Sequence, residues 1–167
     1  MRMSTPATLL LFLGACTSTN AKRARPDRTI DDFECNERSA EYTIAGGLMS
    51  HHQRGLVEPE AGVTVSCAGV TLRLEKWRLF SEDGNRKSSE HSLTPDEFEE
   101  FWQNLESVGW RNLRDCDNPE AADDDPIHSF AIADWSGDKH LTCQGKVLPF
   151  PFDRLRNTFD LTAAAHD

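Results

Sequence analysis

TPDEFEEFWQNLESVG, at residues 94–109, is the stretch that most directly decides the fold. Thr94 is a typical N-cap residue, Pro95 suits the first helical position, and Glu97 completes a Thr-x-x-Glu capping box. Gly109 suits the end of a helix. Between these ends the large apolar side chains recur at helical spacing: Phe98, Phe101, Trp102, Leu105 and Val108. The pattern predicts a helix whose single apolar face packs on a sheet.

Before this helix, apolar and polar residues alternate as they do in strands with one buried face. We expect a strand around residues 42–44. Residues 63–74 are expected to form either a hairpin or one long strand with a bulge at Gly69. Residues 81–89 are rich in polar residues and are predicted to form a turn.

After the helix, the same alternation returns. Residues 127–135 and 139–143 are predicted to form a second hairpin across a polar turn. Asp153 is expected to cap a short final helix. The order of strands, helix, strands and helix predicts an α+β domain, with an antiparallel sheet of about four strands and both helices on one face.

The first fifteen residues have the features of an export signal. Their apolar run, residues 9–15, is far shorter than the roughly 20 residues that span a bilayer. Leu13-Gly14-Ala15-Cys16 resembles the bacterial lipobox. This resemblance implies that Cys16 receives a diacylglyceryl group and becomes the first residue of the mature chain, anchored to a membrane.

Details of the signal leave one alternative and one further expectation. Cleavage after Ala21, with small residues at Thr19 and Ala21, would instead give a soluble secreted protein. If Cys16 is acylated, the absence of Asp after it fits sorting to the outer membrane, facing the periplasm or the cell surface.

The chain is expected to divide into four parts. Residues 1–15 form the signal, 16–32 a flexible tether, 33–162 one globular domain and 163–167 a disordered tail. The tether carries four cations that suit anionic lipid head groups, although such a run is more often simply solvated: Lys22, Arg23, Arg25 and Arg28.

Four cysteines remain for the domain: Cys35, Cys67, Cys116 and Cys143. An even number in an exported chain favours two disulfides, for which three pairings exist. Local sequence does not choose among them; we favour Cys35 with Cys67 and Cys116 with Cys143. A zinc site is disfavoured because no cysteine pair has the C-x₂₋₄-C spacing.

Composition and motifs exclude several function classes. A net charge of -10 argues against nucleic acid as a partner. The acidic run at residues 115–125 fails as an EF-hand, because Glu120 stands where Gly is needed. Adjacent His51 and His52 would point to opposite faces of a strand, so no metal is expected. No phosphate loop, dinucleotide fingerprint or nucleophile elbow occurs, and no cofactor is expected.

The remaining candidates for function are side chains without a diagnostic motif. His128 and His140 fall in the second hairpin and are expected to form a cross-strand packing pair. Trp102 and Trp110 are expected in the core. Trp135, beside the hairpin turn, is the best candidate for a contact residue, since aromatic side chains are enriched in binding hot spots.

These observations predict a lipid-anchored envelope protein that acts as a non-catalytic binding or interaction module, with the membrane and an envelope protein as partners. A hydrolase with a site built from distant carboxylates and histidines is the alternative. The order of elements, with Gly46-Gly47 after the first strand, also resembles small bacterial protease-inhibitor domains of the emfourin type. That resemblance adds protease inhibition to the alternatives and assigns no role to any residue.

Overall fold

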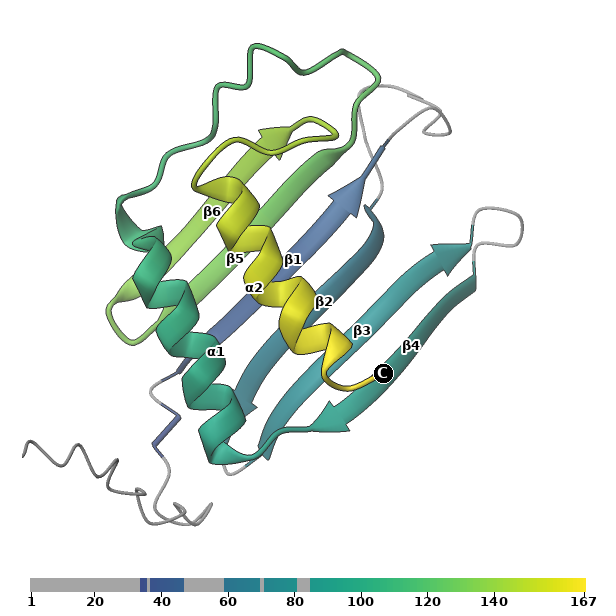
Figure 1. Cartoon of the computed structure of the whole chain (residues 1–167). Helices are drawn as coiled ribbons and strands as arrows, with labels where there is room; N and C mark the ends of the chain where they lie inside the picture. Colours follow the sequence, from purple (N-terminus) through teal and green to yellow (C-terminus); the bar gives the residue numbers. More distant parts are fainter. Residues whose placement is uncertain (1–33, 36, 47–58, 70, 81–84) are drawn as a thin grey trace, which may run out of the picture.

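The domain is a single antiparallel sheet of six strands with two helices on one face (Figure 1). The computed structural model describes residues 34–35, 37–46, 59–69, 71–80 and 85–167. The strand order across the sheet is β4-β3-β2-β1-β5-β6. After the first helix the chain therefore crosses the sheet and adds β5 beside β1.

The elements follow one another with short connections. They are β1 (Ser39–Ala45), β2 (Pro59–Ala68), β3 (Thr71–Phe80), β4 (Asn85–Ser92), α1 (Pro95–Val108), a 3-10 helix (Trp110–Asn112), β5 (Ile127–Asp134), β6 (Gly137–Gln144) and α2 (Phe152–Ala164). The class predicted from the sequence, an α+β domain with an antiparallel sheet, is confirmed.

Helix α1 has the boundaries that its capping residues predict. The Thr94 side chain accepts a hydrogen bond from the Glu97 amide at 3.3 Å. The Glu97 carboxylate in turn accepts one from the Thr94 amide at 2.8 Å. Gly109 ends the helix in the left-handed region, with φ of 74°. These local bonds explain why residues 94–109 could be assigned from sequence alone.

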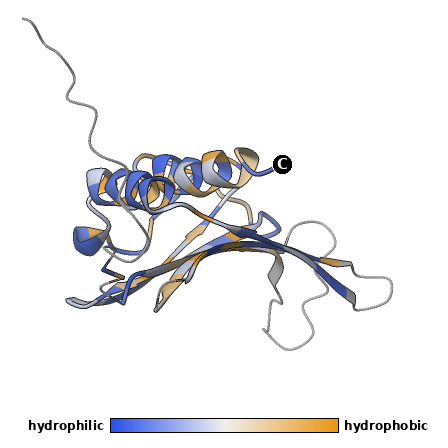
Figure 2. Ribbon diagram, turned by 90° about the horizontal axis from the view of Figure 1, so that it is seen from below, coloured by the Kyte–Doolittle hydropathy of each residue, from blue (hydrophilic) through white to orange (hydrophobic). Residues whose placement is uncertain are grey.

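The core lies between the sheet and the two helices, as Figure 2 shows. Helix α1 contributes Phe98, Phe101, Trp102 and Leu105, and α2 contributes Phe152, Leu155 and Phe159. Alternate strand residues face these helices, among them Tyr42, Val65, Leu74, Phe130 and Leu141. No described helix or strand covers the opposite face, which is called the open face below.

The expected number of about four strands is wrong, because the sheet has six. Residues 85–92, assigned above to a turn, form β4 at the sheet edge. This strand, NRKSSEHS, has no apolar residue, so it lacks the alternation that marks a half-buried strand. Residues 63–74 belong to the hairpin of β2 and β3, with Gly69 at φ of 61° between them.

The C-terminal residues also differ from the expectation. Helix α2 begins after Pro151, with no side-chain cap, so Asp153 lies within its first turn and is not its cap. Instead of a disordered tail at residues 163–167, α2 continues to Ala164. Lys76 Nζ donates to the carbonyl oxygens of Ala163 and His166, each at 3.3 Å. This lysine comes from β3, so no local pattern could have indicated the contact.

Several predictions lie outside the described residues. They are the signal, Cys16, the tether and the His51-His52 pair. Within the described part, neither helix combines the length and the apolar character needed to cross a membrane.

Candidate functional site

Trp135 lies in the turn that joins β5 to β6, and 74% of its surface is exposed. By contrast, Trp102 and Trp110 are buried in the core, as the sequence predicted. We call residues 134–137 the Trp135 hairpin. It is the place where the structure exposes a large aromatic side chain between two regular strands.

The residue before Trp135 fixes the conformation of this turn. The Asp134 carboxylate is 4% exposed and accepts hydrogen bonds from the Ser136 amide at 2.8 Å and the Ser136 hydroxyl at 2.6 Å. Burial raises the pKa of Asp134, but the bonds from Ser136 and Arg111 outweigh burial and hold this pKa below its ordinary value. Asp134 therefore stays ionised and braces the turn.

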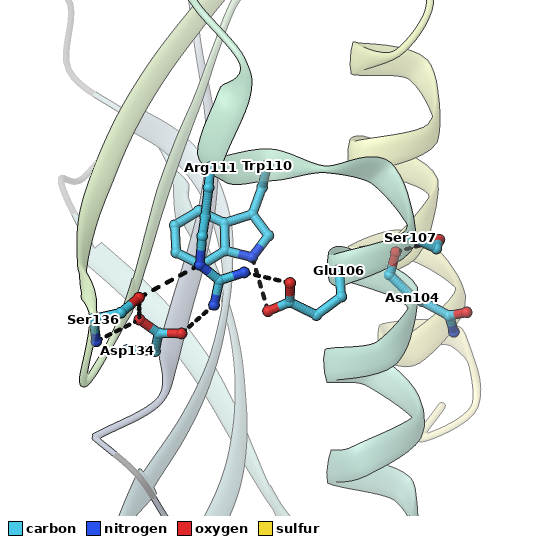
Figure 3. A network of polar contacts seen from close by, with 7 residues as sticks. All are labelled: Asn104, Glu106, Ser107, Trp110, Arg111, Asp134 and Ser136. Carbon is cyan, nitrogen blue, oxygen red and sulfur yellow. Dashed lines mark hydrogen bonds and ion pairs between the residues drawn. The ribbon is translucent and has the colours of Figure 1, made fainter.

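Arg111 connects this turn to helix α1, as Figure 3 shows. Its guanidinium pairs with both Asp134 and Glu106 and lies over the Trp110 ring, 4.2 Å from the ring centroid. Trp110 Nε1 donates to Glu106 at 3.3 Å. The hydrogen bond to Glu106 is the chief cause that raises the pKa of Arg111.

We call this set the Arg111 network: Glu106, Trp110, Arg111, Asp134 and Ser136. It joins the end of α1, the 3-10 helix and the β5–β6 turn, which are far apart in sequence. In α1 itself, Ser107 donates to the Asn104 carbonyl at 2.7 Å. The backbone below Trp135 is thus held from two sides before any partner binds.

The chain enters the domain at the same end of the sheet as Trp135. Ser39, the first residue of β1, pairs with Ala133, two residues before Trp135. Just before β1, Cys35 forms a disulfide with Cys67 near the end of β2, with a Cα–Cα distance of 5.5 Å. Any segment that links the domain to Cys16 therefore starts beside the Trp135 hairpin.

The second disulfide joins Cys116 to Cys143 in β6, with a Cα–Cα distance of 5.0 Å. Next to it, the Cys116 amide donates to the Thr142 carbonyl at 3.0 Å. The structure thus contains the two pairings that we favoured. Disulfides persist in oxidising compartments, so they indicate a protein that folds after export.

The two histidines of the second hairpin do not pair with each other. His128 lies opposite Cys143 and faces the helices, whereas His140 lies opposite Ala131 on the open face, 3.6 Å from Asp138. The expected cross-strand pair is wrong because the two residues fall two positions out of register. With period-2 alternation, this places their side chains on opposite faces.

His128 instead forms a buried pair with Tyr42. Its Nδ1 lies 2.8 Å from the Tyr42 hydroxyl and its Nε2 3.0 Å from the Gly145 carbonyl. Because a carbonyl only accepts, Nε2 carries the proton and Nδ1 accepts from tyrosine. Burial lowers the pKa of His128 and raises the pKa of Tyr42 to about 12. Both side chains are neutral near pH 7 and serve as structural contacts.

The acidic loop has a structural role at its end. Asp125 accepts a hydrogen bond from the Ala122 amide at 3.0 Å, the chief cause that lowers its pKa, and pairs with Lys146 at 2.9 Å. Across the residues that the structure describes, no group of three or more His, Cys, Asp or Glu side chains is placed to hold a metal ion.

Comparison with known proteins finds no family model that matches this chain and no curated protein that matches it. The assignment of function therefore rests on the sequence and on the geometry described above.

Proposed function

We propose that this protein is a bacterial lipoprotein, acylated at Cys16, whose domain is a non-catalytic binding module of the cell envelope. The observation that carries the proposal is the Trp135 hairpin. It presents an aromatic side chain that is 74% exposed on a backbone held by the Arg111 network. A contact residue that is fixed in advance loses little conformational freedom on binding, so more of its contact energy contributes to affinity.

The buried ionisable groups support binding over hydrolysis. A glycosidase needs two carboxyl groups about 5 to 9.5 Å apart. Asp125 and Asp134, the two buried aspartates, flank opposite ends of β5, which has 8 residues. A strand of that length separates them by roughly 25 to 30 Å. Each carboxylate is also engaged in a structural ion pair, with Lys146 or with Arg111.

Attachment at Cys16 is testable by metabolic labelling with an alkyne analogue of palmitate. The wild-type chain should incorporate the label, and Cys16→Ala should lose it. Thr17→Ala, which changes the next residue and leaves the lipobox intact, should keep the label. Label retained by Cys16→Ala would contradict acylation at this residue.

The contact role of Trp135 is testable by site-specific photo-crosslinking in intact cells. A crosslinking amino acid at position 135 should give a discrete protein adduct. The same group at Leu161, which is 72% exposed on α2, provides a matched control on another surface. The absence of an adduct specific to position 135 would contradict the proposal, whereas an adduct with a protease would favour the inhibitor alternative.

A further inference from the structure

A cavity of about 620 Å³ lies on the helix-facing side of the sheet, beside the C-terminal half of α2. Figure 1 shows α2 crossing β1 and β2 and ending near β3, with β4 beyond it. Apolar groups from the first two strands line one part of the cavity: Tyr42, Ile44, Ala61 and Val63. This volume falls within the range of about 300 to 1,000 Å³ that is typical of small-molecule sites.

The other part of the cavity is cationic. Arg78 of β3 lies directly opposite Lys87 of β4, and Ala61 of β2 lies opposite Arg78 on its other side. These three residues therefore share one row and one face of the sheet, and Lys76 is on the same face. Two like charges directly opposite each other destabilise a strand pair. This cost has a purpose if an anion binds between them.

The carboxylates beside the cavity do not reverse its charge. Asp160 pairs with Arg156 at 3.5 Å, and Asp167 pairs with Lys76. Counting Arg78 and Lys87, the described side chains here include four cations and two carboxylates. The positive charge lies mainly on β3 and β4, whereas the apolar surface lies on β1 and β2.

We propose that this cavity binds a small amphipathic carboxylate, with its apolar body on the β1–β2 surface and its carboxylate between Arg78 and Lys87. Guanidinium and ammonium groups make charge-assisted hydrogen bonds to carboxylates, and the neighbouring apolar side chains favour an alkyl body over water. A medium-chain fatty acid is the simplest ligand of this chemistry. The cavity does not involve Cys16 or Trp135, so this inference stands apart from the proposed function.

The test is calorimetric titration of octanoate, and of uncharged 1-octanol, into the full chain carrying Cys16→Ala with both disulfides formed and without detergent. The double variant Arg78→Gln/Lys87→Gln should weaken octanoate binding by about tenfold or more and change octanol binding by less than about twofold. The matched control is Arg73→Gln/Arg86→Gln. It removes the same charge from the same two strands on the open face and should leave octanoate binding within about twofold.

A second variant tests the apolar part of the site. Ala61→Leu places a larger side chain in the cavity and should weaken the binding of octanoate and octanol alike. Thermal unfolding of each variant checks that it is folded, and the exposed pair Arg78 and Lys87 decides the matter if Ala61→Leu does not fold. No octanoate binding by the wild type at millimolar concentration would overturn the proposal. So would an equal loss in the Arg73/Arg86 control, or unchanged binding in a folded Ala61→Leu variant.

Discussion

At the residue scale, the contacts that matter most join side chains that are distant in sequence. The capping box at Thr94 was predictable because donor and acceptor are three residues apart. Tyr42 and His128 are 86 residues apart, so nothing in the sequence marked them as partners. Trp135 was predictable as an exposed aromatic beside a turn, but the Arg111 network below it was not.

The Tyr42–His128 pair makes stability depend on pH. Burial lowers the pKa of His128 below the ordinary 6.5, so the folded state binds fewer protons than the unfolded state below that pH. Stability should therefore fall as the pH decreases from about 6.5 and level off below the folded pKa. Chemical denaturation at a series of pH values measures this slope.

Two variants assign the slope to its residue. His128→Gln can still accept from tyrosine and donate to Gly145, and it does not titrate, so the slope should decrease. His140→Gln, whose parent side chain is 77% exposed, should keep the wild-type slope. Equal slopes in the wild type and His128→Gln would contradict the assignment.

Asp134 provides a prediction in the acidic range. Asp134→Asn removes the ion pair with Arg111 and should lower the free energy of unfolding at pH 7 by about 1 to 3 kcal/mol. Because the pKa of Asp134 is held below 3.8, its contribution is present above that pH and is lost as the pH falls toward the folded pKa. The difference between wild type and variant should shrink there. Asp138→Asn, with a parent side chain that is 72% exposed, should cost less than about 0.5 kcal/mol.

At the element scale, hydrophobic alternation located the strands that cover the core and missed the edge. β5 was predicted because its residues alternate between more and less buried positions along its full length. The polar edge strand β4 gave no such signal. The cavity was also unpredictable, since Arg78 and Lys87 become neighbours only through the register of β3 and β4.

The open face has one close contact between elements that is directly testable. Trp77 of β3 lies opposite Gly62 of β2, and a Cβ atom on Gly62 would meet the indole ring at 2.6 Å. The Arg86 guanidinium lies over the same ring, 4.5 Å from a ring centroid. Gly62→Ala should therefore lower the free energy of unfolding by about 1 to 3 kcal/mol, because the indole must move.

A double-mutant cycle separates this contact from the intrinsic effect of alanine. In a Trp77→Ala background there is no ring to displace, so Gly62→Ala should cost much less or become neutral. Equal costs in the two backgrounds, measured by urea denaturation, would show that the packing of Trp77 on Gly62 is not the cause.

At the scale of the whole molecule, the two disulfides secure opposite parts of the domain. One fixes the segment that enters β1, and the other fixes the segment before β5 to the edge strand β6. Cysteine number predicted that two bonds form, and only the assembled sheet shows which regions they connect. The fold class followed from local patterns, whereas the ligand of the domain depends on surfaces that form when distant strands meet.

The Cys116–Cys143 bond should contribute strongly to stability, because it closes a loop with a sequence separation of 27 residues. Replacing both cysteines by alanine should lower the free energy of unfolding by about 3 kcal/mol under oxidising conditions. Denaturation of the wild type and the variant in guanidinium measures this difference. A variant as stable as the oxidised wild type would show that the bond adds nothing to the folded domain.

The central claim is that Cys16 is the acylated first residue of the mature protein, and mass spectrometry of the N-terminal peptide tests it most directly. Protein purified from the membranes of the native organism should begin at Cys16 and carry the added mass of a diacylglyceryl group, with or without an acyl chain on its amino group. An unmodified N-terminus at Lys22, produced by cleavage after Ala21, would contradict the claim.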